Sequence, residues 1–500
     1  MYCKNCKHEK TFSTNSKGEV SIDKNTAGFH LNIKHLSYQP FQDYINHFSD
    51  TLLVSLQRIN NPLTEVIVTG QLDRSTVHES VNNLIILSNK DIQSSASHHL
   101  GDLLNQNALF DLSFDPAIGS TGVSIQGMSG NNINILLDGM PIVGRKASQI
   151  DLSQINLSNI NKVEILKGPG SVSYGTNSTG GVINLISKKP TYNRISVESY
   201  LENIGIAKIN IDIDRVLKDG DLHFNVGKYS FSGISNSNSR TQLWKWKEQS
   251  FMNLQFYTKI SNLDFLHKIS FASNQIREFN DPQPPFPPTD LTGLALDRYY
   301  NTDRFNHYIK ITNPISRFNW KAIFSYSDTK FTNEQFIVDT ILNTFIQTTD
   351  SLFNTEDRYK VINSRMEILL PENNELFDFQ LGSDFKFENV YGSRILNNSP
   401  HVYEFSFFNQ TSINFNNRLQ TQIGIRIPYH SIYSAPLIPS IHLKYDINES
   451  IQLRSSYAKG FRAPSYKELY MDFFDTNHNI IGNSQLLAEY THSMQSSLNF

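Results

Sequence analysis

Between Thr191 and Phe500 the sequence repeatedly alternates apolar and polar residues, and this period of two limits the possible folds more than any other feature. Ile209, Ile211 and Ile213 would share one face of a strand, because successive side chains of a strand point to opposite faces. The polar positions between and beside them are Lys208, Asn210, Asp212 and Asp214. Apolar residues outside and polar residues inside, over about ten residues, are typical of a transmembrane antiparallel β-barrel with a water-filled interior.

The same alternation recurs further along the chain. Phe377, Phe379, Leu381, Phe385 and Phe387 alternate with Asp378, Gln380, Asp384, Lys386 and Glu388, and Leu419, Ile423, Ile425 and Ile427 oppose Gln420, Gln422 and Arg426. About fourteen candidate strands follow the pattern. A soluble β-sandwich is the alternative, but it would turn its apolar faces inward and use mostly shorter strands.

The composition agrees with a membrane barrel. Aromatic residues make up 12% of the chain and charged residues only 18%, as expected where rings cover the outer wall. The formal net charge of −3, without a Lys/Arg cluster, argues against a nucleic-acid partner. The sequence contains no apolar run of about 18 residues, so a membrane location would require a closed barrel rather than a helix.

The connections between candidate strands differ in length. Short polar turns at 218–220, 371–374 and 414–417 are expected at one end of the barrel. The long segment from Glu278 to Asp303 is expected at the other end, as a loop, because proline cannot donate to a strand ladder. Its proline-rich part makes it a candidate for a lid that captures a ligand, although a plain surface loop is the commoner outcome.

Upstream of the barrel, residues 84–190 consist of short apolar strands separated by glycines. We expect strands at 133–137, 163–166 and 182–186, with a tight turn at Asp138 and Gly139. Gly180 and Gly181 permit a sharp bend before the last strand. Leu100, Leu103 and Leu104 recur at helical spacing on a short helix that Ser97 is expected to cap.

The ordered motifs of this region closely resemble the plug domain of TonB-dependent outer-membrane receptors. They are the Gln126-Gly127 strand, Leu137-Asp138-Gly139, Glu164-Ile-Leu-Lys167-Gly168-Pro169, Tyr174-Gly175 and Gly180-Gly181-Val-Ile-Asn184. The resemblance implies an α/β plug domain over residues 81–190 and a partial outer-membrane β-barrel over 191–500. The family usually carries Arg before the first glycine and often at the position of Lys167, where these arginines bind barrel carboxylates. Gln126 and Lys167 therefore predict a weaker attachment of the plug to the wall.

The first 60 residues resemble, in part, the carboxypeptidase-regulatory-like β-sandwich that precedes such receptors in the Bacteroidetes. Strands are expected at 11–14, 19–22, 29–33 and 51–56. Cys3 and Cys6 have no second ligand pair for a metal and are interpreted as incidental thiols. No signal peptide is recognisable, and about fourteen strands fall short of the roughly 22 of plugged transporters, so we expect a chain truncated at both ends.

Residues 61–80 form a linker that contains a short β-branched strand directly before the plug. Glu65, Val66, Ile67, Val68 and Thr69 resemble a TonB box. An unpaired strand of this kind can add itself to the edge of a partner's sheet. The resemblance therefore implies TonB, with its inner-membrane energising complex, as a partner. An ordinary strand of the preceding domain is the alternative.

Near the C-terminal end, Phe461-Arg-Ala-Pro464 and the degenerate box Asn483-Ser-Gln-Leu486 resemble the barrel signature of the same receptors. His478 lies between these boxes, where haem receptors of the family place an iron ligand, so it is a candidate haem ligand. The alternative is that His478 is a solvent-exposed loop histidine without a ligand-binding role. No resident cofactor or structural metal site is predicted.

The sequence carries no catalytic motif, so an enzyme is not expected. The resemblance implies energised uptake of a scarce ligand across the outer membrane, with a ferric siderophore or haem as the preferred cargo. Cobalamin or another nutrient is the alternative cargo. A surface receptor or adhesin anchored by the barrel is the alternative outside transport.

Overall fold

The computed structural model describes residues 12–15, 18–21, 29–35, 38–45, 51–56, 66–67, 69, 75–76, 80–115, 120–145, 149–168, 170–236, 239–282, 293–313, 319–370, 376–395, 401–416, 418–448, 450–474 and 479–499. The chain divides into two units, Met1–Glu65 and Val66–Phe500. Among the described residues, no helix has both the length and the apolar character needed to cross a membrane.

In the first unit, β1 (Phe29–His35) and β2 (Tyr38–Ile45) form an antiparallel pair. The expected strand at 29–33 is confirmed. The described residues of the other three expected strands, 12–14, 19–21 and 51–56, are not in strands, so those predictions are wrong there. Local alternation does not supply the partner strands that a stable ladder requires. The carboxypeptidase-regulatory-like assignment of residues 1–60 stays a prediction.

The plug is built around a five-stranded sheet in the order β10-β9-β12-β11-β5. Its strands are β5 (Leu84–Leu87), β9 (Ile133–Leu137), β10 (Met140–Pro141), β11 (Ile160–Lys167) and β12 (Gly181–Ser187). Only β12 and β9 are parallel; the other neighbours are antiparallel. The strands expected at 133–137, 163–166 and 182–186 are therefore confirmed.

The remaining plug elements cover this sheet. They are α1 (Asn89–Ser94), α2 (Leu100–Asn105), β6 (Phe110–Asp115), β7 (Ser120–Ile125), β8 (Met128–Ser129), the 3-10 turns η1 (Gly130–Asn132) and η2 (Leu152–Gln154), and α3 (Ser171–Tyr174). Leu100 and Leu104 are completely buried against Ile165 and Ile183 of the sheet in one apolar core.

Two details of the plug differ from expectation. His99, not Ser97, caps α2, because its Nδ1 accepts a hydrogen bond from the Asp102 backbone N–H at 3.3 Å. Gln126 and Gly127 form the turn between β7 and β8 rather than part of a strand. Both residues have positive φ angles, 51° and 79°, which suit a two-residue hairpin turn and not an extended strand.

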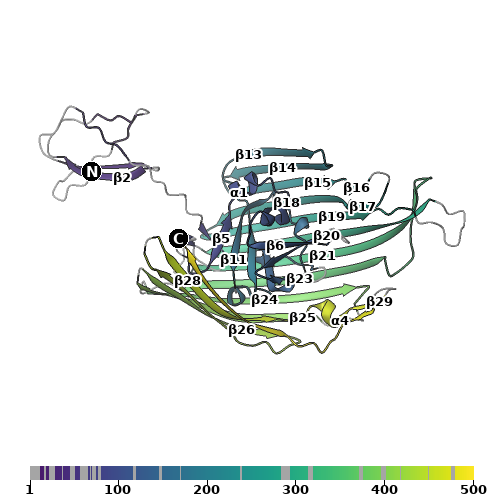
Figure 1. The fold of residues 1–500 in the computed structure, drawn as a ribbon. Helices are drawn as coiled ribbons and strands as arrows, with labels where there is room; N and C mark the ends of the chain where they lie inside the picture. Colours follow the sequence, from purple (N-terminus) through teal and green to yellow (C-terminus); the bar gives the residue numbers. More distant parts are fainter. Residues whose placement is uncertain are drawn as a thin grey trace. The chain divides into compact units, whose positions relative to one another are not determined.

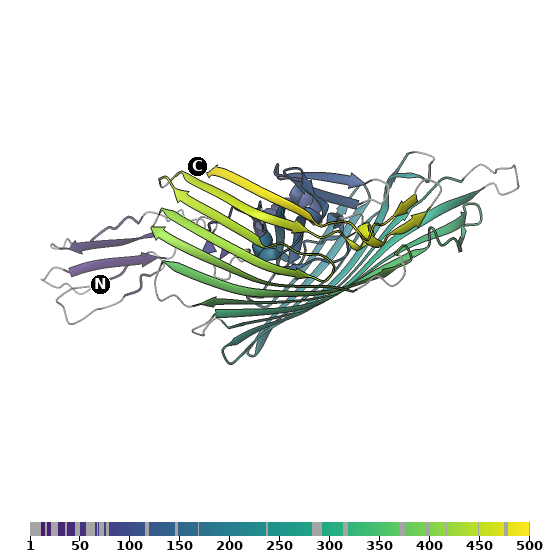
Figure 2. The ribbon, with the colours of Figure 1, turned by 90° about the horizontal axis from the view of Figure 1, so that it is seen from below.

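The second half of the chain forms one large antiparallel sheet of 15 strands, ordered β13-β14-β15-β18-β19-β20-β21-β23-β24-β25-β26-β27-β28-β31, with β22 attached to β21. Its strands are β13 (Arg194–Glu202), β14 (Ile206–Leu217), β15 (Gly220–Phe231), β18 (Trp246–Ile260), β19 (Leu263–Glu278), β20 (Leu294–Asn313), β21 (Asn319–Asp339), β22 (Thr344–Gln347), β23 (Thr355–Leu370), β24 (Phe377–Gly392), β25 (Val402–Asn416), β26 (Leu419–His430), β27 (Ile438–Asp446), β28 (Gln452–Arg462) and β31 (Glu489–Asn499). The continuous path contains the expected fourteen strands. Figure 2 shows this sheet curving around the plug.

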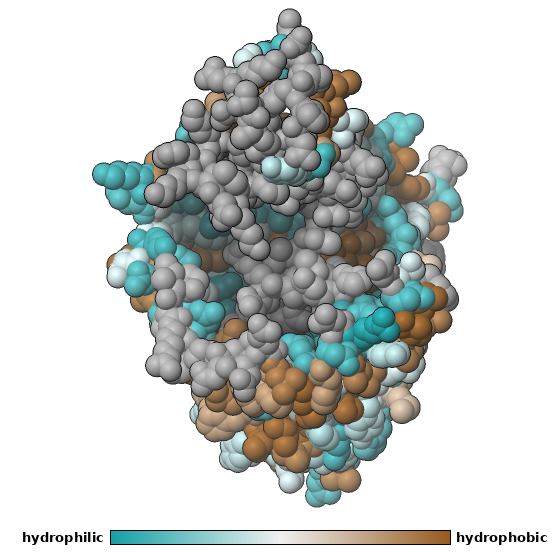
Figure 3. Space-filling model, turned by 90° about the vertical axis from the view of Figure 1, so that its left-hand side faces the viewer, coloured by the Kyte–Doolittle hydropathy of each residue, from teal (hydrophilic) through white to brown (hydrophobic). Residues whose placement is uncertain are grey.

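The two faces of the large sheet have opposite chemistry. Ile209, Leu381 and Ile425 are exposed on the outer face, whereas Asn210, Gln380 and Arg426 of the same strands are buried inside. Apolar side chains gather along the lower outer flank in the space-filling view (Figure 3). The alternation in the sequence is therefore confirmed as apolar outside and polar inside, which is the arrangement of a barrel in lipid.

Connections at one end of the sheet are short, and those at the other end include long ones. Lys218 and Asp219 alone join β14 to β15, and Ser261 and Asn262 alone join β18 to β19. We call this the short-turn end. The described residues of the connections at the opposite end, which we call the long-loop end, include 279–282, 340–354 and 463–474 (Figure 1). The expected loop at 278–303 is wrong for residues 294–303, which belong to β20, and its proline-rich residues 283–288 lie outside the described part of the chain.

Smaller elements complete this unit. They are β3 (Val66–Ile67) with β4 (Ser75–Thr76), β16 (Ile234–Ser235) with β17 (Gln242–Trp244), β29 (Asp472–Phe474) with β30 (Asn479–Ile481), and α4 (Tyr466–Tyr470).

Candidate functional site

A cavity of about 830 Å³ lies between the plug and the inner wall, toward the long-loop end. The plug contributes the segments Gly139–Arg145 and Tyr174–Asn177, and the wall contributes strands β23 to β26 and the segment around α4. These plug segments lie directly after β9 and at the end of α3. A volume of this size accommodates a small organic ligand.

Charged groups in the cavity wall are arranged in pairs. Lys386 Nζ lies 2.7 Å from a Glu388 carboxylate oxygen and 3.2 Å from Glu404 Oε1. Arg426 Nη1 lies 2.8 Å from Asp384 Oδ2. These residues are on three neighbouring strands, β24, β25 and β26. The spacing of these residues in the sequence does not indicate that they form ion pairs, so the sequence did not predict them as residues of a common cavity.

The Phe461-Arg-Ala-Pro464 motif fixes the wall beside the cavity. Phe461 is completely buried with Val172 of the plug and Ile438 of the wall. The Arg462 guanidinium lies 3.1 Å from Glu468 Oε2 and donates from Nε to Glu489 Oε2 at 2.8 Å. The motif therefore holds α4 against β28 and β31, and its role in this structure is positional.

A second link joins the plug to the wall at the Asp138–Gly139 turn. The Asp138 carboxylate lies 2.8 Å from Lys268 Nζ of β19 and accepts a hydrogen bond from the Ser187 backbone N–H at 2.9 Å. The Tyr308 hydroxyl donates to the Asp138 carbonyl oxygen at 3.0 Å. Burial raises the pKa of Asp138, but Lys268 and the Ser187 hydrogen bonds more than offset this, and the pKa lies below its ordinary value.

This ion pair is relevant to the prediction that the plug is attached to the wall more weakly than in other members of the family. Gln126, where the family usually has Arg, is exposed in its hairpin turn. Lys167 is partly buried at the end of β11, and its pKa is lowered by burial and by the positive charge of Arg454. At the Asp138 turn the plug supplies the carboxylate and the wall supplies the cation. The strength of the attachment remains a prediction.

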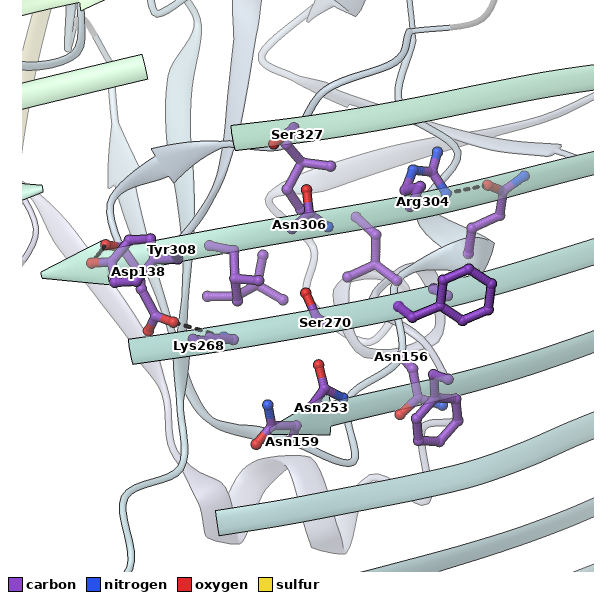
Figure 4. Close-up of a pocket in the computed structure, with 18 of the residues that line it drawn as sticks. Asp138, Asn156, Asn159, Asn253, Lys268, Ser270, Arg304, Asn306, Tyr308 and Ser327 are labelled. Carbon is purple, nitrogen blue, oxygen red and sulfur yellow. Dashed lines mark hydrogen bonds and ion pairs between the residues drawn. The ribbon is translucent and has the colours of Figure 1, made fainter. Parts of the chain in front are cut away.

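A smaller cavity of about 150 Å³ lies beside this ion pair (Figure 4). Asn156 and Asn159 approach it from the plug, and Asn253, Ser270 and Asn306 approach it from neighbouring wall strands (Figure 4). Apolar side chains, among them Met140 and Phe271, make up most of the remaining lining. This cavity is too small for a ferric siderophore, haem or cobalamin.

The segment interpreted as a TonB box is described only in part. Glu65 and Val68 lie outside the described residues. Val66 and Ile67 pair with Thr76 and Ser75, so this portion is not the unpaired strand that was expected. Within the described residues this pairing covers Val66 and Ile67 on one strand and Ser75 and Thr76 on the other.

Thr69 is anchored in the plug. Its backbone N–H donates to Glu164 Oε2 at 2.7 Å, and its hydroxyl donates to the same oxygen. Asn184 Nδ2 donates to the Thr69 hydroxyl oxygen at 2.9 Å, and Lys162 Nζ lies 2.7 Å from Glu164 Oε1. Thr69 and Glu164 are both completely buried. The structure thus joins the end of the candidate box to the Glu164 motif, a contact that the sequence did not predict.

The glycine motifs shape the plug and do not assemble a separate site. Gly139 and Gly168 have φ angles of 88° and 81°, which favour glycine. A Cβ on Gly180 would lie 2.8 Å from the Met128 Cβ, and one on Gly181 would lie 2.9 Å from the Leu166 carbonyl oxygen. Pro169 and His478 lie outside the described residues, so the haem-ligand assignment stays a prediction. The described residues contain no group of three or more His, Cys, Asp or Glu able to hold a metal ion.

Solved structures share this architecture. The siderophore receptor PirA from Acinetobacter baumannii superposes with a TM-score of 0.65 at 14% identity, over 84% of this chain and 68% of that one. The ferric enterobactin receptor PfeA from Pseudomonas aeruginosa, in complex with enterobactin, gives a TM-score of 0.64 at 15% identity, over 83% and 69%. At these identities the likeness shows the fold alone.

Two curated relatives are similar in sequence. The vitamin B12 transporter BtuB of Vibrio vulnificus (strain CMCP6) is 22% identical over 433 residues, 84% of this chain and 64% of the transporter. The rhizobactin receptor of Rhizobium meliloti (strain 1021) is 32% identical over 130 residues, 25% of this chain and 17% of the receptor. The chain thus spans less than two thirds of the length of either relative.

Family models cover most of the plug and barrel. Residues 76–182 match the TonB-dependent receptor plug domain, and residues 218–500 match the TonB-dependent receptor-like β-barrel. Members of this family are outer-membrane receptors and transporters rather than enzymes. With its plug, its antiparallel sheet and matches to both family models, the chain belongs to the TonB-dependent receptors.

Proposed function

We propose that this protein imports a scarce small-molecule ligand across the outer membrane, with energy delivered by TonB and its inner-membrane complex. The observation that carries the proposal is the position of the 830 Å³ cavity, which is bounded by turns of the plug and by the inner wall at the long-loop end. A ligand in this cavity contacts the plug directly, so its binding can favour one state of the plug over another.

The proposed cargo is a ferric siderophore or haem, and cobalamin is the second candidate. A siderophore is supported by the sequence match to the rhizobactin receptor, and cobalamin by the longer sequence match to a vitamin B12 transporter. Haem rests on His478 alone. A receptor or adhesin without transport is distinguished by its failure to accumulate any ligand inside the cell.

In the proposed mechanism, the segment Glu65–Thr69 couples ligand binding to TonB. Release of Thr69 from Glu164 would expose the backbone of this segment at the plug's periplasmic side. TonB would then add the strand to its own sheet through main-chain hydrogen bonds, and a pull on it would be transmitted to β11 of the plug.

Val66→Pro tests this coupling. Proline fixes φ and removes the backbone N–H, so pairing with a partner strand is damaged. Accumulation of radiolabelled ligand by cells should fall to the level of a receptor-free strain, whereas surface binding should stay close to that of the wild type. Gln71→Pro, beyond the candidate box, is the matched control and should retain uptake. Both variants must be recovered in the outer-membrane fraction in normal amounts. Undiminished uptake by Val66→Pro would show that the box is wrongly placed.

A further inference from the structure

Among the residues that the structure describes, the lining of the large cavity has no excess of positive charge. Its lining contains five basic residues, Arg145, Arg365, Lys386, Arg426 and Lys467, and five acidic residues, Asp115, Asp384, Glu388, Glu404 and Glu468. With histidine neutral, these charges cancel. A site built to attract a polyanion would be expected to carry a clear surplus of cations.

The cations that line the wall are also occupied by neighbouring carboxylates. Lys386 bridges Glu388 and Glu404, at 2.7 and 3.2 Å. Arg426 lies 2.8 Å from Asp384 Oδ2, and Arg365 lies 3.4 Å from the other oxygen of the same carboxylate. Arg365 also pairs with Glu367, which lies outside the cavity lining. Each side chain therefore already has a partner of opposite charge.

The two remaining cations are also engaged. Lys467 Nζ lies 3.3 Å from Asp357 Oδ2. Arg145, on the plug, donates to the carbonyl oxygens of Gly130 and Ile133 at 2.8 and 2.9 Å. A polyanionic ligand would have to displace carboxylates from the four paired cations of the wall or remain beside those carboxylates, whereas Arg145 is held by carbonyl oxygens alone among the hydrogen bonds given above. Either outcome is costly, because partly buried charges that lose their partners are poorly compensated.

Neutral polar groups and rings complete the lining. The Tyr433 hydroxyl is buried and makes no hydrogen bond among the described residues. Burial raises the pKa of Tyr433 to about 12, so the hydroxyl stays a neutral donor. Thr176 and Asn177 on the plug face the same space, with the rings of Tyr174 and Tyr466. These groups recognise amides, hydroxyls and flat apolar surfaces rather than net charge.

From this charge balance we infer that the cavity selects a metal complex of low net charge with an amide-rich periphery, and discriminates against polyanionic chelates. This inference rests on the proposed function and narrows its cargo. A neutral ferric hydroxamate chelate and a corrinoid share this chemistry. A catecholate chelate such as ferric enterobactin, which is trianionic, does not.

Equilibrium binding to cells that display the full chain tests the inference. The radiolabelled probes are ferrichrome as a neutral ferric hydroxamate, cyanocobalamin as a neutral corrinoid, and ferric enterobactin as the trianion. At least one neutral probe should bind at least tenfold more tightly than ferric enterobactin. The better neutral probe separates the hydroxamate from the corrinoid.

Glu404→Gln provides a second, independent reading. It removes one negative charge beside Lys386, and one charge acting on a trianion across roughly 8 Å of a wet cavity changes affinity by about tenfold. The affinity for ferric enterobactin relative to the neutral probe should therefore rise by about tenfold. Glu356→Gln is the matched control, because Glu356 pairs with Lys330 and is absent from the cavity lining. It should leave the ratio unchanged.

The outcomes separate the inference from the proposed function. The inference is overturned if ferric enterobactin binds more tightly than both neutral probes. It is also overturned if the ratio of the affinities for ferric enterobactin and the neutral probe is the same in Glu404→Gln and Glu356→Gln. Neither result contradicts the proposed uptake of a small ligand. Binding of none of the three probes above the level of receptor-free cells overturns the inference. Failure of the proposed function is read separately, from the absence of TonB-dependent accumulation of any ligand.

Discussion

Thr69→Val should release the candidate TonB box from the plug. The substitution keeps the shape of the side chain but removes the hydroxyl, which donates to the Glu164 carboxylate and accepts from Asn184 Nδ2 at 2.9 Å. A hydrogen bond to a charged group contributes about 1.5–3 kcal/mol, and a neutral one about 0.5–1.5 kcal/mol. Their loss should destabilise the docked segment by about 2–4 kcal/mol. The backbone bond from Thr69 N–H to Glu164 remains, at 2.7 Å.

Hydrogen exchange measures this release, because amide protection follows the free energy of local opening. A loss of about 2 kcal/mol corresponds to roughly 30-fold faster exchange in peptides that cover residues 66–69. Thr179→Val is the matched control. Thr179 is a buried plug threonine whose hydroxyl donates to Asn132 Oδ1 at 3.0 Å, away from the candidate box. Equal exchange at 66–69 in the wild type and Thr69→Val would refute the reasoning that this hydroxyl holds the segment.

Two further predictions concern the plug–wall ion pair and the haem hypothesis. Asp138→Asn leaves the Lys268 ammonium without its carboxylate partner, and the Lys268 side chain is only 3% exposed. The free energy of unfolding at neutral pH, measured by chemical denaturation, should therefore fall by about 3–5 kcal/mol. Burial raises the pKa of Asp138, but Lys268 and the Ser187 hydrogen bonds together lower it below its ordinary value near 4. The stabilisation is therefore present above that ordinary pKa and is lost as the pH falls through the lower pKa of the folded protein. The stability of the wild type should fall in acid relative to that of Asp138→Asn, and parallel pH profiles of the two proteins would count against the ion pair. If haem is the cargo, the receptor should give a Soret band on haem addition that His478→Ala weakens; an unchanged band would keep haem and reject His478 as its ligand.

The local pattern of the sequence was enough to predict the alternating strands of the barrel and three of the five strands of the plug sheet. Ile209 and Asn210 differ in chemistry, and they lie on opposite faces because a strand turns successive side chains apart. The turn at Asp138 and Gly139 is equally local, since few residues other than glycine adopt a φ of 88°. Two local predictions were wrong: His99 caps α2 in place of Ser97, and Gln126 and Gly127 form a hairpin turn rather than a strand.

The tertiary structure alone decided which side chains of these strands come together on the inner face of the sheet. Lys386, Glu404 and Arg426 lie on three strands, and nothing in their spacing reveals that they line one cavity with cancelling charges. Thr69 and Glu164 are 95 residues apart, yet they share a buried hydrogen bond. The alternation of apolar and polar residues and the choice of turn residues depend on adjacent positions, so they can be predicted from the sequence. The net charge of a cavity and the anchoring of a segment depend on side chains that only the folded sheet brings within a few ångströms.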